Sequence, residues 1–387
     1  MARRVYLDWL RGLAVVIMIL WHSMDAWTSP AARHTPIFDW VIFTGGWAAP
    51  LFLFLAGVSV ALAGAARAAK PQAPSHRSQA SVLQRRGWQI FALAFLFRFQ
   101  SFILNPGAPW VTLLKPDILN VLGLGIVAAA FCWGRATSTI RRSVWLAGPA
   151  AAIVLVTPWS REWRWPALLG KLAPPLEGYI RPVPGVGGFS MFPWLAFVVA
   201  GAFVGVLIAG ARVSAREPIF HVRLGLAGLA IGIAGYAGSY LPPPFAPSSF
   251  WTTSLSFFLI RLGVMTLGVA LAWLWMRRPG AGRWSPMVIF GRTSLFVYWV
   301  HVELAYGFAS YPLHVALPLP WAFAAFAGLT AIMLGAAVLW LRRRRPLVPA
   351  YLRSAPVSVE RRFSGSSSLE GGVSRFTSRR RSSSGSN

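Results

Sequence analysis

Residues 5–27 read VYLDWLRGLAVVIMILWHSMDAW, an apolar run long enough to cross a bilayer as one helix. Met-Ala-Arg-Arg followed by such a run mimics a secretory signal peptide. However, the run carries Asp8 and Arg11 and ends at Asp25 and Trp27 instead of a small-residue cleavage site. We therefore interpret it as a retained first membrane span.

The whole chain has the same character as this first run. Of its 387 residues, 56% are hydrophobic and 12% are charged, whereas soluble domains have about 25% charged residues. The apolar residues fall into blocks of about 20, the length of a transmembrane helix. The blocks lack the alternation of barrel strands. The sequence therefore predicts an all-α polytopic transmembrane helical bundle bound to the lipid bilayer.

We expect about ten spans. They are Val5–Trp27, Phe38–Ala66, Gly87–Leu104, Asp117–Trp133, Ser143–Pro158, Phe189–Ala211, His221–Leu241, Thr253–Met276, Pro286–Ala309 and Trp321–Leu341. Arg and Lys gather in alternate connections, such as residues 67–86 between the second and third spans. The positive-inside rule then predicts cytoplasmic N- and C-termini and a multi-pass protein of the plasma (inner) membrane. The long connection Pro158–Gly188 breaks the alternation, as long loops do.

The C-terminal segment differs in composition from the rest. We divide the chain into a transmembrane domain, residues 1–345, and a basic Ser/Arg-rich tail, residues 346–387, that lacks the apolar residues needed to fold. The net charge of +27 lies between the spans and in this tail, so we expect no nucleic-acid partner. Cys132 is the only cysteine, and no metal-ligand spacing occurs, so we expect no metal.

The first span carries a polar stripe. Arg11 and His22 are eleven residues apart, which is close to three helical turns and about 16 Å along one face. Asp25 joins that face, and Asp8 lies where it can pair with Arg11. Such a stripe must face protein or water. The alternative is that Arg11 and His22 merely anchor the helix at the two interfaces.

Further polar residues follow in the outer loop and the second span. His34 lies in the loop and Asp39 opens the span, which continues through Gly45-Gly46 to Pro50-Leu-Phe-Leu-Phe-Leu-Ala-Gly-Val-Ser59. The small residues permit close helix approach, and packing alone explains this segment.

The run Asp8-Trp-Leu-Arg11-Gly-Leu-Ala, the histidines after it and the Pro50–Ser59 run resemble the heparan-alpha-glucosaminide N-acetyltransferase catalytic domain family. The likeness is strongest over residues 4–62, with a second patch at Gly291–His301. The chain is also similar to membrane surface-sugar O-acyltransferases, whose hallmark is an Arg and a His separated by ten residues. The resemblance implies transfer of an acyl group from cytoplasmic acetyl-CoA, or another acyl-CoA, to a sugar or glycan acceptor.

The two families place their catalytic histidine differently. The heparan-type enzymes have an Asn near the position of His22 and their histidine in the loop, where His34 lies. The O-acyltransferases use the histidine of the helix. We favour His22 because it fits the spacing to Arg11, and we keep His34 as a second candidate catalytic residue.

Span nine adds Ser294, Tyr298 and His301 on one helical face. By the expected topology His301 lies at the depth of His22, so a substrate-binding site between the two helices is geometrically possible. The alternative is a hydrogen-bonded contact between helices.

Two deep arginines complete the candidate residues. Arg98 could pair with an outer acid such as Asp39, and both are candidates for substrate binding. Arg261 is a candidate for the phosphates of the acyl-CoA donor. A structural ion pair is the alternative for each arginine.

Acyl transfer needs a base, stabilisation of the thioester oxyanion and protection from water. His22, oriented by Asp25, meets the first need, while Tyr298 and Arg11 are candidates for the second. Acyl transfer to an amine or hydroxyl of an envelope sugar is therefore our hypothesis. One alternative is a secondary transporter of a sugar or lipid precursor, with His22 and Asp25 as a proton relay; another is a non-catalytic scaffold.

Overall fold

The fold is described from a computed structural model of the chain. It describes residues 4–70, 75–104, 109–186, 189–211, 217–243, 245, 248–280 and 284–343, with Ala167 placed by its backbone alone. All of these residues lie in one structural unit, Met1–Arg344. The predicted tail, residues 346–387, lies outside the described residues.

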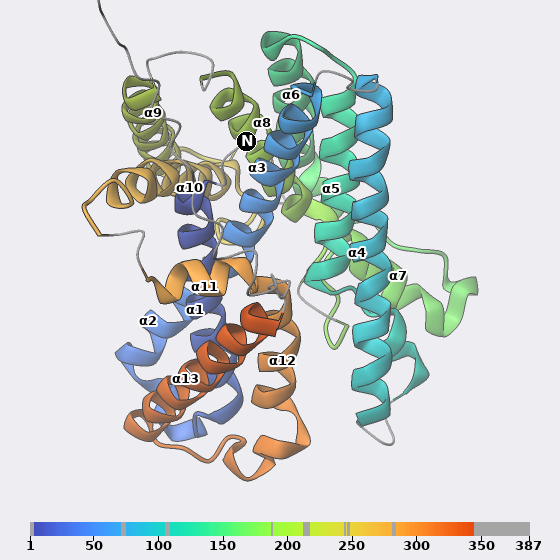
Figure 1. Cartoon of the computed structure of the whole chain (residues 1–387). Coiled ribbons are helices and arrows are strands. Elements are labelled where there is room, and N and C mark those ends of the chain that lie inside the picture. The colour runs from blue at the N-terminus through green and yellow to red at the C-terminus, as the bar shows by residue number, and fades with distance from the viewer. Residues whose placement is uncertain are drawn as a thin grey trace, which may run out of the picture. The chain divides into compact units, whose positions relative to one another are not determined.

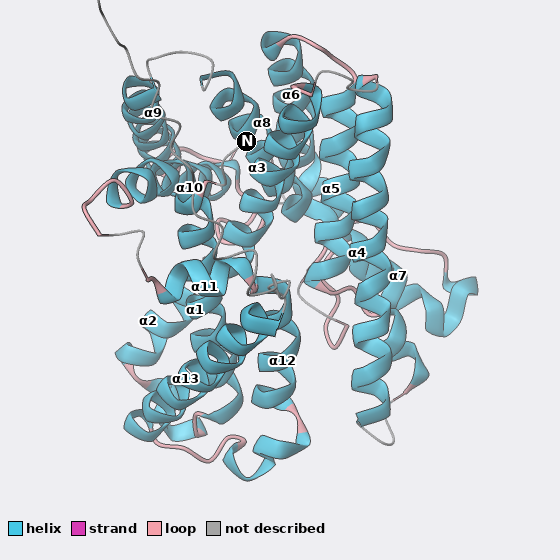
Figure 2. Cartoon of the chain, viewed as in Figure 1, coloured by secondary structure: helices cyan, strands magenta, loops and turns pink. Residues whose placement is uncertain are grey.

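Within the described residues the regular structure is helical, and a single bridge joins Thr28 to Leu317 (Figures 1 and 2). The longer helices are α1 (Val5–Trp27), α2 (Pro36–Gly45), α3 (Ala48–Ala68), α4 (His76–Leu104), α5 (Ile118–Gly134), α6 (Thr139–Ser160), α7 (Ala173–Ile180), α8 (Met191–Ala211), α9 (Glu217–Gly238), α10 (Leu255–Trp275), α11 (Pro286–Arg292), α12 (Ser294–Tyr306) and α13 (Leu319–Arg343). Short 3-10 turns lie at Pro30–His34, Trp110–Leu114, Ala167–Leu172 and Phe308–Leu313. The predicted all-α class is confirmed.

Nine helical segments of the described chain are long and apolar enough to cross a membrane, and they correspond to nine of the ten predicted spans. The tenth predicted span, Pro286–Ala309, is divided into α11 and α12 at Thr293. The backbone of Thr293 leaves the helical region at φ −116° and ψ 15°. The carbonyl of Ile289 accepts from the hydroxyl of Thr293 at 2.9 Å and from its backbone N–H at 3.2 Å, so the polar groups at the break are hydrogen-bonded within the protein.

The second predicted span is also interrupted, because α2 ends at Gly45 and α3 begins at Ala48. Conversely, α4 begins eleven residues before the predicted Gly87. That additional stretch, which includes Arg85 and Arg86, is too basic to be recognised as a span but is rich in good helix formers.

Helix α1 connects the two largest buried clusters. One cluster combines α1 with α3, α4, α5, α6, α8, α9 and α10. The other combines α1 with α11, α12 and α13, which Figure 1 shows beside it, and with the first residue of α3. The first half of α1 therefore packs mainly with one helix group and its second half with the other.

Glycines allow the closest helix contacts. A Cβ atom on Gly12 would lie 1.8 Å from the carbonyl oxygen of Met287, and one on Gly291 would lie 1.7 Å from that of Asp8. Only glycine permits this backbone approach between α1 and α11, as is typical of membrane helix pairs. The contact fixes where α12 begins relative to α1.

Candidate active site

A cavity of about 600 Å³ lies among α1, α2, α3, α4, α5, α8 and α12. Small residues at the α2–α3 break line part of it, namely Gly45, Gly46, Ala48 and Ala49. Its polar lining residues are His22, Arg98, Ser101, Asp117, Tyr298 and Glu303. Its aromatic lining includes Trp21, Phe52, Phe97, Trp194 and Tyr306. The size and the mixture of aromatic wall with a few polar groups are those of a small-molecule site.

His22 and His301 meet at the wall of this cavity. The Nδ1 atom of His22 lies 2.8 Å from the Nε2 atom of His301, and the two rings are nearly parallel, at 13°. His301 is fully buried behind His22, which itself lines the cavity. The structure thus brings together two residues that the sequence predicts to lie at one depth.

The hydrogen bonds determine which nitrogens carry protons. The Nδ1 atom of His301 lies 2.7 Å from the carbonyl oxygen of Val297, so it must be the donor. In a neutral ring the Nε2 atom of His301 then accepts, and the Nδ1 atom of His22 must donate to it. This assignment, which rests on hydrogen-bond geometry, leaves the Nε2 atom of His22 unprotonated. His22 therefore has a free basic nitrogen.

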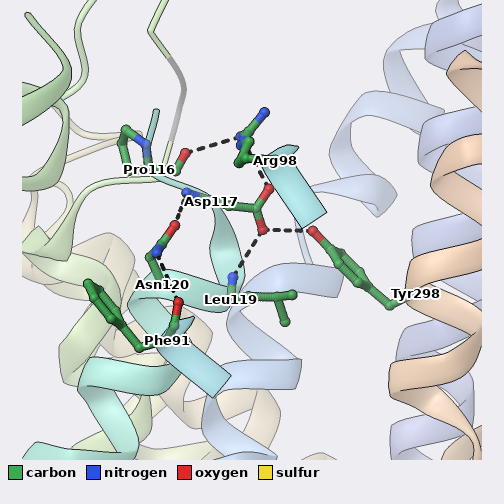
Figure 3. A network of polar contacts seen from close by, with 7 residues as sticks. All are labelled: Phe91, Arg98, Pro116, Asp117, Leu119, Asn120 and Tyr298. Atoms are coloured by element: carbon green, nitrogen blue, oxygen red, sulfur yellow. Dashed lines mark hydrogen bonds and ion pairs between the residues drawn. The ribbon is translucent and has the colours of Figure 1, made fainter. Parts of the chain in front are cut away.

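Asp117 forms a second polar cluster at the cavity, shown in Figure 3. Its Oδ1 atom accepts a hydrogen bond from the hydroxyl of Tyr298 at 2.7 Å. Its Oδ2 atom pairs with the Nη2 atom of Arg98 at 3.2 Å. Asp117 also caps α5, because its Oδ1 atom accepts from the backbone N–H of Leu119 at 3.1 Å, while Asn120 bonds back to the Asp117 N–H at 2.9 Å. One carboxylate thus joins α4, α5 and α12.

These bonds commit some donors and leave others available. The single proton of Tyr298 is directed to Asp117, so it does not point at a substrate oxygen. Arg98 also donates to the carbonyl of Pro116 at 3.3 Å, but its buried Nε atom has no hydrogen-bond partner among the described residues. Arg98 thus retains donor capacity beyond its bonds to Asp117 and Pro116.

Tyr179 on α7 lies close enough to Arg98 and Asp117 to interact with their charges. Burial is the main cause that raises the pKa of Tyr179 to about 12. The phenol is thus neutral at physiological pH, and its buried hydroxyl has no partner among the described residues. The Tyr179 side chain thus places a polar but uncharged group beside the Asp117 cluster.

Asp25 does not contact His22 through any hydrogen bond that the structure shows. Its Oδ2 atom accepts from the hydroxyl of Tyr306 at 2.7 Å, and the Tyr306 ring lies edge-on to His22 at 5.7 Å between centroids. Asp25 is therefore connected to His22 only indirectly, through a ring that packs on His22.

Arg11 lies away from this cavity. Its Nη2 atom donates to the hydroxyl of Ser59 at 2.7 Å, and its Nη1 atom lies 3.4 Å from Asp8 Oδ1, the pairing expected from their spacing. Arg11 therefore connects α1 to α3, and it does not line the cavity.

The remaining candidates lie outside the cavity lining. His34 and Asp39 are exposed, and Ser294 is half-buried at the start of α12. Arg98 pairs with Asp117 and not with Asp39. Arg261 lies 4.1 Å from the ring of Phe257, and its Nη2 atom would be 3.6 Å from a Cβ on Gly46. It is thus a neighbour of the cavity across Gly46.

Four cavity residues with a hydroxyl or carboxylate group were not among those predicted from the sequence: Ser101, Asp117, Glu303 and Tyr306. Asp117 was recognised only as the start of a span. The sequence did contain a signal for Asp117, because the chain has only 10 acidic residues and an acidic residue at the end of a span is costly to place. Among the described residues, no group of three or more His, Cys, Asp or Glu side chains could hold a metal ion.

The fold and the cavity define a multi-pass membrane protein with a ligand-sized site between its helices. Residues 3–229, more than half of the 387, match the family described as heparan-alpha-glucosaminide N-acetyltransferase, catalytic, and the chain belongs to that family. This confirms the resemblance seen in residues 4–62 and makes the protein a membrane enzyme of the acetyltransferase type. No curated protein matches the chain significantly. His22, Arg98 and Asp117 lie within the matched range, whereas Tyr298 and His301 lie beyond it.

Proposed function

We propose that the protein transfers an acetyl or other acyl group from cytoplasmic acyl-CoA to an amine or hydroxyl of a periplasmic or cell-envelope sugar. In this proposal it resides in the inner membrane with both termini in the cytoplasm, and His22 is the catalytic base. The observation that carries the proposal is the His22–His301 pair, 2.8 Å apart, at the wall of a cavity of about 600 Å³. Histidine is the common general base near neutral pH.

In the reaction that we propose, the unprotonated Nε2 atom of His22 accepts the proton of the acceptor. The acceptor nitrogen or oxygen attacks the thioester carbonyl carbon, and its proton passes to the free Nε2 atom of His22. The bond from carbon to sulfur then breaks, and the departing CoA thiolate takes that proton. His301 holds the base in one orientation and stabilises the cationic ring while it carries the proton. The products are the acylated sugar and CoA as free thiol.

The Asp117 cluster is suited to bind the substrate. Arg98 can donate to the thioester oxygen or to an acceptor oxygen, while Asp117 and Glu303 can accept from hydroxyl or amine groups. The rings of Trp21 and Trp194 supply apolar faces on the same cavity. We assign the acceptor to this part of the cavity.

Asp25, Arg11 and Arg261 have supporting roles in this proposal. Asp25 is a positioning residue that acts through Tyr306. Arg11 is about three turns from His22 and remains our candidate for contact with the donor as it enters from the cytoplasmic side. Arg261 lies beside Gly46 of the cavity and remains our candidate for contact with the phosphates of the acyl-CoA donor.

Purified full-length protein in detergent or nanodiscs tests the proposal. The release of CoA thiol from acetyl-CoA is measured with amino sugars, neutral sugars and envelope glycans as acceptors, and the acylated product is identified by mass spectrometry. The proposal predicts thiol release that depends on an acceptor. Transport of an unmodified sugar into proteoliposomes, with acetyl-CoA left intact for every acceptor, would support the transporter alternative and overturn the enzyme.

A further inference from the structure

A second cavity, of about 320 Å³, lies between α4 and α5, at the end of α5 opposite to Asp117. It is lined by Arg77, Ala80, Gln84, Phe131, Gly134 and Arg135. The two helices lie side by side in Figure 1. Small residues create the space, since a Cβ on Gly134 would lie only 2.5 Å from that of Ala80. The cavity is separate from the candidate active site and shares no residue with it.

The positive charge of this cavity is not balanced. Arg77 and Arg135 are both exposed, and the guanidinium group of neither forms a hydrogen bond or ion pair with another described residue. Their sequence neighbourhood holds no acid either, because no Asp or Glu occurs between Asp39 and Asp117 or between Asp117 and Glu162. Both guanidinium groups are thus available to an anion.

A third arginine beside the cavity is held in place. Arg142 donates from Nε to the carbonyl of Ala136 at 2.9 Å, and its Nη2 atom lies 3.0 Å from Nδ1 of His76. Its guanidinium also stacks on the ring of Trp133 at 4.0 Å. Arg142 adds to the local positive potential, which favours anions, while its own donors are largely occupied.

The surface next to the two free arginines is apolar. The guanidinium of Arg135 lies 4.2 Å from the ring of Phe131 and 5.9 Å from that of Trp145. Phe131 and Trp145 are 45% and 44% exposed, and Ile140 and Val144 on α6 are exposed still further. A free inorganic ion makes no favourable contact with such an apolar surface, whereas the acyl chains of a lipid would cover it.

We propose that the cavity lined by Arg77 and Arg135 binds the phosphate of an anionic phospholipid headgroup. Arginine presents several N–H donors in a planar fork that matches phosphate oxygens. Basic pockets between membrane helices on the cytoplasmic side bind anionic headgroups in this way. The inference does not depend on the acyl transfer proposed above.

The general excess of basic residues at the cytoplasmic surface is the alternative explanation, and the chain offers a matched control for it. Arg277 and Arg278, at the end of α10, are exposed, stack on Trp273 and Trp275, and lie outside this cavity. The test compares Arg77→Gln/Arg135→Gln with Arg277→Gln/Arg278→Gln, two variants that lose the same charge. Native mass spectrometry of full-length protein measures binding of phosphatidylglycerol and of phosphatidylcholine.

We expect wild type to retain one phosphatidylglycerol in preference to phosphatidylcholine. The Arg77→Gln/Arg135→Gln variant should bind phosphatidylglycerol at least about tenfold more weakly, since each arginine near the surface adds to the attraction. The Arg277→Gln/Arg278→Gln variant should bind it as wild type does. An equal loss of phosphatidylglycerol binding in both variants would show that general surface charge alone attracts the lipid, and it would overturn the proposal.

Two further measurements keep the test decisive. Inorganic phosphate at millimolar concentration is added to wild type, and displacement of the lipid at that concentration would show that the cavity binds free phosphate and overturn the lipid assignment. Arg77→Lys/Arg135→Lys keeps the charge and serves if the glutamine variant does not fold. This lysine variant should still bind phosphatidylglycerol, but more weakly than wild type, because lysine lacks the planar fork. Binding as tight as that of wild type would contradict the proposed geometry.

Discussion

The Nδ1 atom of His22 on α1 lies 2.8 Å from the Nε2 atom of His301 on α12, although the two residues are 279 positions apart in the chain. Because His301 already donates to the carbonyl of Val297, it can only accept from His22 while neutral. The pair therefore has one free basic nitrogen, on the residue that lines the cavity. This asymmetry is the basis for assigning the base to His22 and a positioning role to His301.

Replacement of His301 tests that division of roles. We expect His301→Ala to lower kcat by more than about tenfold, since the base loses its orientation and the support of its cationic form, while KM changes little. His301→Gln should recover part of the rate, because its amide oxygen can accept from Nδ1 of His22. The pH profile of kcat is the second readout, and an identical profile and rate in His301→Ala would contradict the positioning role.

Asp117 is expected to matter for both stability and activity. Asp117→Asn keeps an N-cap for α5 but removes the charge that pairs with Arg98 and orients Tyr298. The free energy of unfolding should fall by about 1–3 kcal/mol, the cost of losing hydrogen bonds to a charged group. A lower Tm in intrinsic fluorescence and a higher KM for the acceptor are the expected measurements.

The control for Asp117→Asn is Asp39→Asn, which makes the same chemical change at an exposed position. It should leave Tm and KM unchanged. If the two variants behave alike, Asp117 is no more than a helix cap.

The contact between Gly291 and the backbone of Asp8 should tolerate no side chain. Gly291→Ala would place a Cβ 1.7 Å from the Asp8 carbonyl oxygen, so α11 must move away from α1. We expect a loss of about 1–3 kcal/mol in stability, as in other overpacked contacts, together with reduced activity because α12 moves with α11. Gly328→Ala on α13 meets nothing within 4 Å and should be neutral. An unchanged Tm in Gly291→Ala would show that the helices are not held this closely.

Ala49 offers a way to fill the cavity without disturbing its polar groups. Ala49→Phe puts a ring into a space of about 600 Å³ that Ala49 lines. Since ligands bind in this space by our proposal, kcat/KM should fall at least about tenfold with no loss of Tm. Ala69→Phe, at the exposed end of α3, is the matched control and should keep wild-type kinetics. Full activity in Ala49→Phe would place the reaction elsewhere.

Much of the fold was predictable because a bilayer imposes a length on each helix. Nine of the predicted spans appear as single long helical segments or as close pairs. The break at Thr293 was not predicted, because hydropathy averages over a window and does not detect one residue with a non-helical backbone. The early start of α4 was missed for a related reason, since the stretch with Arg85 and Arg86 is helical without being apolar.

The candidate site was less predictable, because its contacts join distant parts of the chain. Spacing placed His22 and Asp25 on one face of the first span, and depth placed His301 level with them. The sequence does not indicate which helices are neighbours. The partner of Arg98 was therefore expected to be Asp39, whereas the packing of α4 against α5 makes it Asp117.

The central claim is that His22, and not His34, is the base for acyl transfer. The most direct measurement is the rate of thiol release from acetyl-CoA by His22→Ala and by His34→Ala, each with an acceptor that wild type uses. We predict that His22→Ala is slower by about 10²-fold or more, the usual contribution of a general base, and that His34→Ala, whose exposed side chain lies outside the cavity lining, keeps the wild-type rate. An inactive His34→Ala beside a fully active His22→Ala would contradict the account.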